Sequence, residues 1–392
     1  MFRNAIVHRM KIIIATPIYP PEIGGPATYT KELCERLHDE HEITVVAYTD
    51  VREPFKGTTL VPVSKQRPLL TRLIKYFLAV YRASKDADLI YVQNAMAAGL
   101  PVALVSILRH KPFVLKFVGD EAWERATQHR LTEKRLEDFL SSPEGGLKIK
   151  FMMAIQEFVL KRASVVTTPS AYLLEELKKT YGVKDKQAVV NYNAAEETEV
   201  LPFDATKVPH QIATTARLVA WKGIDGMIRA LKIVREKFPD AKLVVAGDGP
   251  ELENLKKLKS ELGLDDAVEL LGKVSRAETW QLRKRSELYV LNSTYEGLPH
   301  TVLTSFAAHI PTIATDIPGT NEALYHEKTG LLVKPNDPQG LAEAIERLFN
   351  DPVYAQKLAG QGYALLKEKF SWEAHIKNLN AIFRSIVSKP SN

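Results

Sequence analysis

Residues 288–304 read LYVLNSTYEGLPHTVLT and show the unit from which the chain is built. The apolar run 288–291 is typical of a buried strand, and the residues after Pro299 fit a helix. A strand followed by a loop and a helix belongs in a parallel sheet, where ligands bind beyond the carboxyl ends of the strands. Glu296 and Gly297 occupy this loop. The stretch is therefore either a polar turn with a solvated glutamate or part of a ligand site.

Strand-like runs alternate with helical patterns along the whole chain. The first half has such runs at 11–16, 43–47, 89–92, 113–117, 164–168 and 187–190, and the second half has them at 211–216, 242–246, 267–271, 287–291 and 311–314. Parallel strands need crossover connections, which are usually helices. Two such series predict an α/β fold with two Rossmann-like, doubly wound domains that face a cleft.

The length of 392 residues also favours two domains. The segment 191–210 contains two prolines, several acidic residues and little periodicity, so it is the best candidate for a linker. We therefore place an N-terminal domain at residues 1–200 and a C-terminal domain at residues 201–370.

The charge balance points to an anionic partner, because the net charge is +6 and the isoelectric point is near 9.0. Nucleic acid, an acidic membrane surface and a phosphorylated small molecule are the three candidates. The sequence has no basic recognition helix, zinc-ligand spacing or aromatic RNA-binding motif. Nucleic acid is therefore not expected as a partner.

The compartment is suggested by the single cysteine, Cys34, which excludes an intramolecular disulfide and fits a reducing environment. Residues 1–9 lack the apolar core of a signal peptide. The longest apolar run, 95–108, is shorter than the ~20 residues that span a bilayer. We expect a cytoplasmic protein that is either free or peripheral at the inner membrane face.

The segment 65–85 combines apolar and cationic side chains. The apolar ones are Leu69, Leu70, Leu73, Phe77, Leu78 and Tyr81, and the cationic ones include Arg67, Arg72, Lys75, Arg82 and Lys85. A basic amphipathic helix can lie on an anionic membrane surface. The same pattern fits a helix that turns its apolar side to the core and its cationic side to solvent. The sequence leaves both interpretations open.

The pair Gly24-Gly25 follows the first strand and precedes a helical pattern. Backbone N–H groups in such a loop can approach an anion at the N-terminus of the helix. The pair lacks the Gly-x-Gly-x-x-Gly spacing of dinucleotide sites, which disfavours an oxidoreductase with the same two-domain pattern. A flexible loop without a ligand is the alternative.

Arg217 and Lys222 flank the loop between the first strand of the second half and a helix predicted over 222–238. Arginine offers a forked set of donors and lysine a point charge, so the pair suits a diphosphate. Solvated surface charge is the alternative. No metal site is expected, because the Asp-x-Asp at 86–88 precedes a strand instead of following one.

Taken together, these motifs resemble the retaining glycosyltransferases of the GT-B fold, specifically glycosyltransferase family 4 (group 1). The matching residues are Gly24-Gly25, Arg217, Lys222-Gly223, Gly247-Asp248-Gly249-Pro250, Gly272-Lys273-Val274, Glu296-Gly297-Leu298-Pro299, and the segments 315–322, 329–333 and 370–372. The resemblance extends from Lys11 to about Phe383. Its specificity lies in the order and spacing of the motifs.

The resemblance implies a metal-independent hexosyltransferase that retains stereochemistry and needs no separate cofactor. Its donor would be a UDP- or GDP-linked sugar, and its acceptor a carbohydrate, a lipid-linked molecule or another small molecule. Arg217 and Lys222 would hold the donor diphosphate, while Gly272, Lys273 and Val274 would contact the base through the backbone. Glu296 and the amides of Gly297 and Leu298 would address the transferred sugar.

Two further expectations come from the same resemblance. Gly24 and Gly25 would approach the diphosphate and the acceptor from the first domain. The last helix, within 371–392, would cross back to the first domain.

The chain departs from the family pattern at three positions. Thr304 stands where a second glutamate commonly grips the nucleotide ribose, His309 stands where a glycine is usual, and Val118 stands where many relatives have a histidine. The first departure raises an alternative function, a catalytically weakened family member that binds nucleotide.

Overall fold

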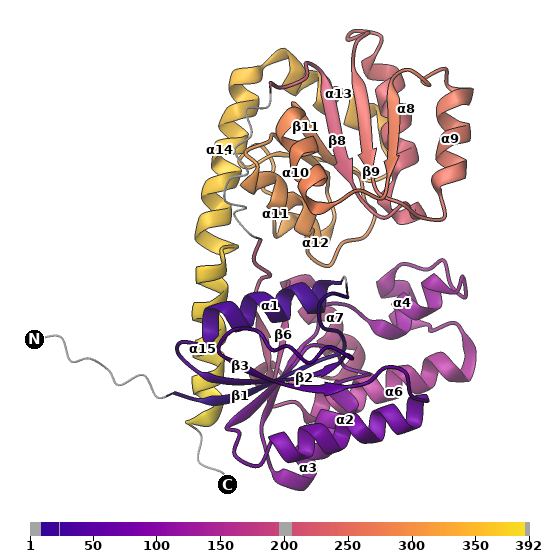
Figure 1. Ribbon diagram of the computed structural model, residues 1–392. Helices are drawn as coiled ribbons and strands as arrows, with labels where there is room; N and C mark the ends of the chain where they lie inside the picture. The colour runs from indigo at the N-terminus through magenta and orange to yellow at the C-terminus, as the bar shows by residue number, and fades with distance from the viewer. Residues whose placement is uncertain (1–8, 23, 196–205, 389–392) are drawn as a thin grey trace, which may run out of the picture. The chain divides into compact units, whose positions relative to one another are not determined.

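The computed structural model describes residues 9–22, 24–195 and 206–388 (Figure 1). The chain divides into two compact units, the first formed by Met1–Asn191 with Ile376–Asn392 and the second by Tyr192–His375. The domain boundary predicted at residue 200, most of the N-terminal extension and the middle of the predicted linker lie outside the described residues.

The first unit is built on a seven-stranded parallel sheet. Its strands are β1 (Lys11–Thr16), β2 (Glu42–Tyr48), β3 (Thr58–Val63), β4 (Leu89–Val92), β5 (Phe113–Lys116), β6 (Val165–Thr168) and β7 (Ala188–Val190), in the order β3-β2-β1-β4-β5-β6-β7. All residues of β4, β5 and β6 are buried, as expected for a sheet covered on both faces. The strand order reverses between β1 and β4.

Seven α-helices connect these strands. They are α1 (Gly25–Leu37), α2 (Leu69–Ala83), α3 (Gly99–Arg109), α4 (Glu121–Gln128), α5 (Leu136–Ser141), α6 (Gly146–Arg162) and α7 (Ala171–Tyr181). Parallel crossovers are right-handed, so the direction of each connection decides which face its helix covers. Accordingly, α1 covers one face of the sheet, and α2, α3 and α6 cover the other (Figure 1).

The second unit repeats this architecture with six parallel strands. They are β8 (Gln211–Thr215), β9 (Lys242–Ala246), β10 (Val268–Gly272), β11 (Leu288–Leu291), β12 (Thr312–Thr315) and β13 (Leu331–Val333), in the order β10-β9-β8-β11-β12-β13. The helices are α8 (Ile224–Val234), α9 (Leu252–Glu261), α10 (Arg276–Arg285), α11 (His300–Ala307), α12 (Pro318–Asn321), α13 (Pro338–Asn350) and α14 (Pro352–Lys369). Here the order reverses between β8 and β11.

The structure confirms every strand that the sequence predicted and adds two, β3 and β13. Both are sheet-edge strands with weak patterns, since β3 contains Pro62 and only one buried residue, and β13 has three residues. The helix predicted over 222–238 is shorter than expected. It begins at Ile224, after a 3-10 turn, η2 (Ala220–Lys222), and ends at Val234.

The last helix, α15 (Trp372–Val387), begins in the second unit and belongs to the first unit from Ile376 onward. Within the first unit its Asn380 lies 3.0 Å from the Nε2 atom of His41, and the ring of Phe383 packs against Tyr91. The expectation that the C-terminal helix returns to the first unit is confirmed.

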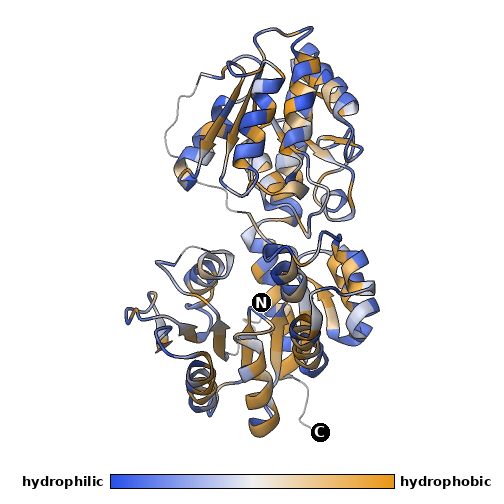
Figure 2. Ribbon diagram, turned by 90° about the vertical axis from the view of Figure 1, so that its right-hand side faces the viewer, coloured by the Kyte–Doolittle hydropathy of each residue, from blue (hydrophilic) through white to orange (hydrophobic). Residues whose placement is uncertain are grey.

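Hydrophobic residues gather on the strands of both units, and the helices combine hydrophobic and hydrophilic faces (Figure 2). Cys34 is fully buried on α1, and this burial raises the pKa of its thiol to about 12. None of the helices in the described ranges is long and apolar enough to cross a membrane.

Candidate functional site

Most of the residues predicted to bind a ligand lie at the carboxyl edge of the second sheet. Arg217 and Lys222 lie on the loop after β8, and Glu296 lies on the loop after β11. These strands are neighbours at the point where the strand order reverses. In open α/β sheets such a switch point is where ligands bind, because the two loops diverge to opposite faces and leave a crevice.

An ion pair joins the two loops. Lys222 Nζ lies 2.5 Å from Glu296 Oε1, and their side chains are 20% and 12% exposed. The Ser293 hydroxyl donates a 2.7 Å hydrogen bond to the same oxygen. Within the described residues, Glu296 Oε2 has no hydrogen-bond partner. The carboxylate is therefore fixed through one oxygen and can accept a ligand hydroxyl at the other.

Hydrogen bonds and close packing join the loop after β8 to the loop after β11. The Asn292 side chain donates a 2.8 Å hydrogen bond to the carbonyl of Gly223, and the Thr294 amide donates one of 2.8 Å to the carbonyl of Trp221. Gly223 has φ +59°, and a Cβ there would lie 2.2 Å from the Asn292 carbonyl oxygen. A glycine is required at this position for Lys222 to reach Glu296.

The loop that carries Glu296 is also supported from α12. A Cβ on Gly319 would lie 1.9 Å from the Glu296 carbonyl oxygen, so backbone packs directly on backbone there. The Thr315 hydroxyl, at the end of β12, donates a hydrogen bond to the carbonyl of Ser293. Glu296 thus belongs to a loop that is held from β8 on one side and from β12 on the other.

The main chain next to Arg217 is fixed by neighbouring backbone, and the Arg217 side chain is exposed. The neighbouring Leu218 amide donates a 3.0 Å hydrogen bond to the carbonyl of Asp248, and a Cβ on Gly249 would lie 2.3 Å from the Leu218 carbonyl oxygen. The Gly247–Pro250 turn therefore positions this loop. In the part of the chain that the structure describes, no side chain or carbonyl binds the Arg217 guanidinium, which leaves it available to an anion.

The residues predicted to face the base lie at the edge of the sheet, after β10. Gly272 has φ +69° and accepts a 2.8 Å hydrogen bond from the Gly247 amide. Lys273 is exposed, and Val274 packs against the hydrophobic core. The following helix, α10, begins with a capping box formed by Ser275 and Glu278. The turn after β10 is thus tied to Gly247 by a backbone hydrogen bond and leads directly into a capped helix.

The remaining members of the quoted stretch form the start of α11. Leu298 is packed in the core, and Pro299 is the N-cap residue. Among the described residues, the amides of Gly297 and Leu298 donate no backbone hydrogen bond. They are thus free to bind an oxygen of a ligand, as the resemblance predicts.

Two of the departures from the family pattern, Thr304 and His309, lie on or just after α11. The Thr304 hydroxyl donates a 3.0 Å hydrogen bond to the carbonyl of Thr301 on its own helix. His309 has φ +54°, a left-handed conformation that favours glycine after a helix end, and its ring packs on Tyr363. The glycine usual in relatives therefore reflects backbone conformation, which His309 adopts at some cost.

Gly24 and Gly25 belong to the first unit, where they lie at the carboxyl end of β1 and begin α1. Space is open around Gly25, since a Cβ there would have no neighbour within 4 Å among the described atoms. Val118, the third departure, is 46% exposed on the loop after β5. Each unit thus carries its own set of the predicted residues at a carboxyl edge.

The sequence reasoning missed several supporting residues. Asn292 and Gly319 shape the Glu296 loop, and their signal was a polar residue at a strand end and a glycine after a proline. Arg283 is 5% exposed on α10, donates to the Thr215 hydroxyl and the Thr279 carbonyl, and has a buried Nε without a partner among the described atoms. Nothing in the sequence distinguished it from a surface arginine.

The carboxyl edge of the first sheet has a different chemistry. Asp120 is 1% exposed and accepts hydrogen bonds from the Trp123 amide, the Gln156 side chain and the Tyr181 hydroxyl. Burial raises the pKa of this carboxyl. Lys116, at the end of β5, is 6% exposed, and burial lowers the pKa of its ammonium to about 7. Across the described residues, no group of three potential metal ligands is found.

Two family models match this chain. The model described as "Glycosyl transferases group 1" matches residues 202–364, and the model described as "Glycosyltransferase Family 4" matches residues 23–198. Each model covers one series of strands and helices, and together they include all the motifs at the two carboxyl edges. The two halves of the chain thus match two glycosyltransferase family models, and the chain is a glycosyltransferase.

Relatives and solved structures agree with this assignment. An uncharacterized glycosyltransferase of Methanocaldococcus jannaschii is 25% identical over 96% of this chain and 98% of its own length. A lipopolysaccharide core biosynthesis glycosyltransferase of Rhizobium meliloti is 32% identical over 49% of this chain and 55% of its own. The Anabaena protein HepE, crystallised with UDP and glucose, superposes with a TM-score of 0.75 at 21% identity and covers 96% of this chain and 100% of its own. This glycosyltransferase has the GT-B fold.

Proposed function

We propose that this glycosyltransferase moves a sugar from a UDP- or GDP-linked donor to a carbohydrate or lipid-linked acceptor, with retention of stereochemistry and without a metal ion. The observation that carries the proposal is the Lys222–Glu296 pair at the switch point, with the exposed Arg217 on the same loop as Lys222. Cations that bind a diphosphate and a carboxylate that binds a sugar are the two requirements of a donor site.

The leaving group explains the two cations. Breaking the bond between sugar and phosphate builds negative charge on the diphosphate. Lys222 and Arg217 would stabilise this charge, and a preorganised donor of this kind is typically worth ~10²–10³ in rate. The two side chains would supply the positive charge that a divalent ion supplies in other phosphate sites, which is why no metal is needed in this proposal.

The carboxylate explains how the sugar is held. Glu296 Oε1 is occupied by Lys222 and Ser293, so the orientation of the carboxylate is fixed before a donor arrives. Glu296 Oε2 and the amides of Gly297 and Leu298 would bind sugar hydroxyls. In a retaining transfer by same-face attack, the departing diphosphate would take the acceptor proton, and Lys222 would remain its counter-ion.

The solved structures suggest which base to test first. Crystals of the Anabaena protein HepE hold UDP, UDP with glucose, or UDP-glucose. The lipopolysaccharide enzyme of Rhizobium meliloti supports a lipid-linked acceptor as one class. UDP and UDP-glucose are accordingly the first probes, and GDP-linked sugars are the second.

A calorimetric screen of nucleoside diphosphates, followed by turnover of the matching sugar donors, tests the proposal. We expect UDP or GDP to bind, the matching sugar donor to release its nucleoside diphosphate, and EDTA to leave this release unchanged. Proton NMR of the first product should show the anomeric configuration of the donor. Inversion of that configuration, or loss of turnover in EDTA, would contradict the proposed mechanism.

Thr304 supports a second candidate function, a weakened family member that binds nucleotide. Its hydroxyl already donates to the Thr301 carbonyl, and it cannot provide the charged acceptor that a glutamate would offer to ribose. Nucleotide binding without measurable turnover of any sugar donor would favour this candidate.

A further inference from the structure

Exposed apolar side chains concentrate on three helices of the first unit. Seventeen large hydrophobic residues are exposed in the described part of the chain, and ten of them lie on α2, α3 and α6. The ten are Leu69, Leu70, Ile74, Leu78, Leu104, Ile107, Leu108, Leu147, Phe151 and Phe158, with exposed fractions from 38% to 87%. Scattered exposed apolar residues are ordinary in soluble proteins, whereas a contiguous set marks an interaction surface.

The three helices are neighbours, so their exposed residues form one surface. α3 packs against α2 on one side and against α6 on the other, and all three cover the same face of the sheet (Figure 1). On α2 the exposed residues Leu70, Ile74 and Leu78 follow one another at four-residue spacing, which places them in a single row. We refer to the ten residues together as the α2–α3–α6 face.

The structure therefore changes the interpretation of the segment 65–85. Only Tyr76 and Val80 of α2 are buried against the sheet. The solvent side was expected to be cationic if the helix faced the core, but it carries Leu70 and Ile74 at 74% and 58% exposure. Packing against the sheet and against α3 thus leaves four apolar residues of this helix exposed, namely Leu69, Leu70, Ile74 and Leu78.

The charges on the same helices are almost all positive. The cations on α2, α3 and α6 are Arg72, Lys75, Arg82, Arg109, Lys148, Lys150, Lys161 and Arg162, and the acids number one, Glu157. Glu157 is paired with Lys161. Apolar residues flanked by cations are typical of surfaces that bind anionic membranes.

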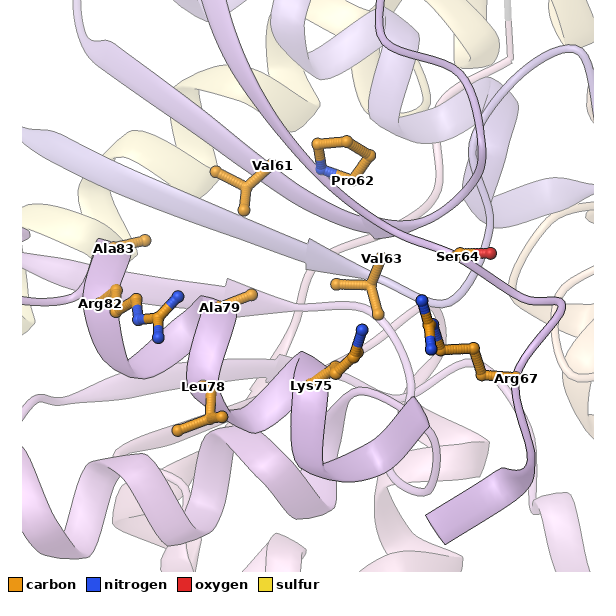
Figure 3. Close-up of a pocket in the computed structure, with 10 residues that line it drawn as sticks. All are labelled: Val61, Pro62, Val63, Ser64, Arg67, Lys75, Leu78, Ala79, Arg82 and Ala83. Carbon is orange, nitrogen blue, oxygen red and sulfur yellow. The ribbon is translucent and has the colours of Figure 1, made fainter. Parts of the chain in front are cut away.

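A basic groove lies between α2 and the edge strand β3 (Figure 3). Its volume is about 570 Å³, and its lining includes Arg67, Lys75 and Arg82 but no acidic residue. Arg67 and Lys75 direct their nitrogen atoms into the same part of the groove, and Arg82 lies toward its other end (Figure 3). Within the described residues, none of the three forms an ion pair or a side-chain hydrogen bond.

We propose that the α2–α3–α6 face binds the surface of a bilayer that contains anionic phospholipids, and that the groove holds a headgroup phosphate. The apolar residues enter the boundary between headgroups and acyl chains, while Arg67, Lys75 and Arg82 neutralise the phosphate. This inference deepens the membrane partner suggested by the sequence and names its residues. It does not rest on the donor chemistry, which a soluble assay measures separately.

A second copy of the chain is a poorer occupant. A two-fold dimer through this face would bring the same patch of each copy together. The cations of one copy would then face those of the other, with Glu157 as the one acid on these helices. An anionic bilayer instead supplies the missing negative charge.

Co-sedimentation with vesicles tests the charge part of the proposal. The full chain should bind vesicles of equal parts phosphatidylcholine and phosphatidylglycerol, and bind phosphatidylcholine alone far more weakly. The triple variant Arg67→Gln, Lys75→Gln, Arg82→Gln should bind the mixed vesicles at least about tenfold more weakly. The matched control Lys256→Gln, Lys257→Gln, Lys328→Gln removes the same charge from the second unit and should bind like the wild type.

A second variant tests the apolar part. Leu70→Ser, Ile74→Ser, Phe151→Ser changes only exposed residues, so the fold is retained, and binding to mixed vesicles should fall by about tenfold or more. Val353→Ser, at an apolar residue of the second unit that is 82% exposed, is the control and should change nothing. Release of the nucleoside diphosphate from a soluble sugar donor should be equal in all four variants.

Three results would overturn the proposal. The first is failure of the wild type to bind the mixed vesicles, or binding equal to that of the wild type by the Arg67/Lys75/Arg82 variant and by the Leu70/Ile74/Phe151 variant. The second is saturable binding of inorganic phosphate to the groove in calorimetry without vesicle binding, which would assign the groove to a soluble phosphate compound. The third is a dimer in analytical ultracentrifugation that the apolar variant dissociates, which would assign the face to a second copy.

Discussion

The two units share a sheet architecture but use their carboxyl edges differently. In the second unit, two glycines lie directly against the backbone of the loop after β11, Gly223 next to Lys222 and Gly319 on α12. In the first unit, the corresponding loop glycine Gly25 has open space around it, and the nearby polar groups Asp120 and Lys116 are buried. Under the proposed function, the second edge would hold the charged donor rigidly, while the first would leave room for a variable acceptor.

The largest effect is expected when a cation is removed from the second edge. Lys222→Ala should lower kcat/KM for the sugar donor by ~10²–10³, because the leaving diphosphate loses a preorganised counter-charge. Lys232→Ala, on an exposed position of α8, is the matched control and should keep normal turnover. Wild-type activity in Lys222→Ala would show that the second edge does not hold the leaving group.

A glycine exchange compares the packing of the two edges. Gly319→Ala should lower the free energy of unfolding by about 1–3 kcal/mol, because the new Cβ meets the Glu296 carbonyl oxygen and the loop must move. Gly25→Ala should be neutral or slightly stabilising, since it adds a helix-favouring residue in open space. Denaturant titration of both variants makes the comparison.

Two outcomes would change this comparison of the two edges. A Gly25→Ala protein of normal stability that turns over donor poorly would reveal ligand contact at the first edge. Equal stability of the Gly319→Ala variant and the wild type would instead show that the Glu296 loop yields easily, contrary to a rigid second edge.

The buried lysine of the first edge should make stability depend on pH. The pKa of Lys116 is about 7 in the folded chain and ~10.4 when unfolded, so the folded state binds fewer protons between these values. The unfolding free energy of the wild type relative to Lys116→Met should therefore rise from pH 7 to pH 9, by at most ~1.4 kcal/mol per pH unit.

Denaturant titrations at pH 7, 8 and 9 measure this difference. Lys31→Met removes an exposed lysine of α1, whose side chain is 51% exposed, and should show no such trend. A constant difference between the wild type and Lys116→Met across this range would mean that Lys116 stays charged in the fold.

The last prediction is a gain of donor affinity at the second edge. Thr304→Glu restores the carboxylate usual in the family, and a charge-assisted hydrogen bond of about 1.5–3 kcal/mol should tighten donor binding roughly ten- to a hundredfold. Thr304→Gln, a neutral side chain of the same length, is the control. Calorimetry that finds the three proteins equal would remove the ribose role from this position.

The fold could be predicted from the sequence to a large extent, because parallel strands buried on both faces leave continuous apolar runs such as 89–92 and 288–291. The exceptions, β3 and β13, are edge strands whose patterns are interrupted or short. Local chemistry also begins two helices of the second unit, where Asp337 and Asp351 each precede a proline and accept a hydrogen bond from the first turn.

The site was predicted as a set of residues, and their contacts were not. Arg217, Lys222 and Glu296 were recognisable from their positions after strands, but the direct pairing of Lys222 with Glu296 depends on how the loops after β8 and β11 approach each other. The roles assigned to these residues, and those of Gly272, Lys273 and Val274, stay predictions until a donor is bound.

The sequence by itself determined the class of fold, most of its strands and the candidate residues for a donor site, because periodicity and loop position are local properties of the chain. The tertiary structure alone decided three further features. It fixed Glu296 through Lys222, Ser293 and the backbone of Gly319, it buried Lys116, and it gathered the α2–α3–α6 face from segments far apart in the chain. Contacts of this kind depend on packing between distant residues, which no local pattern records.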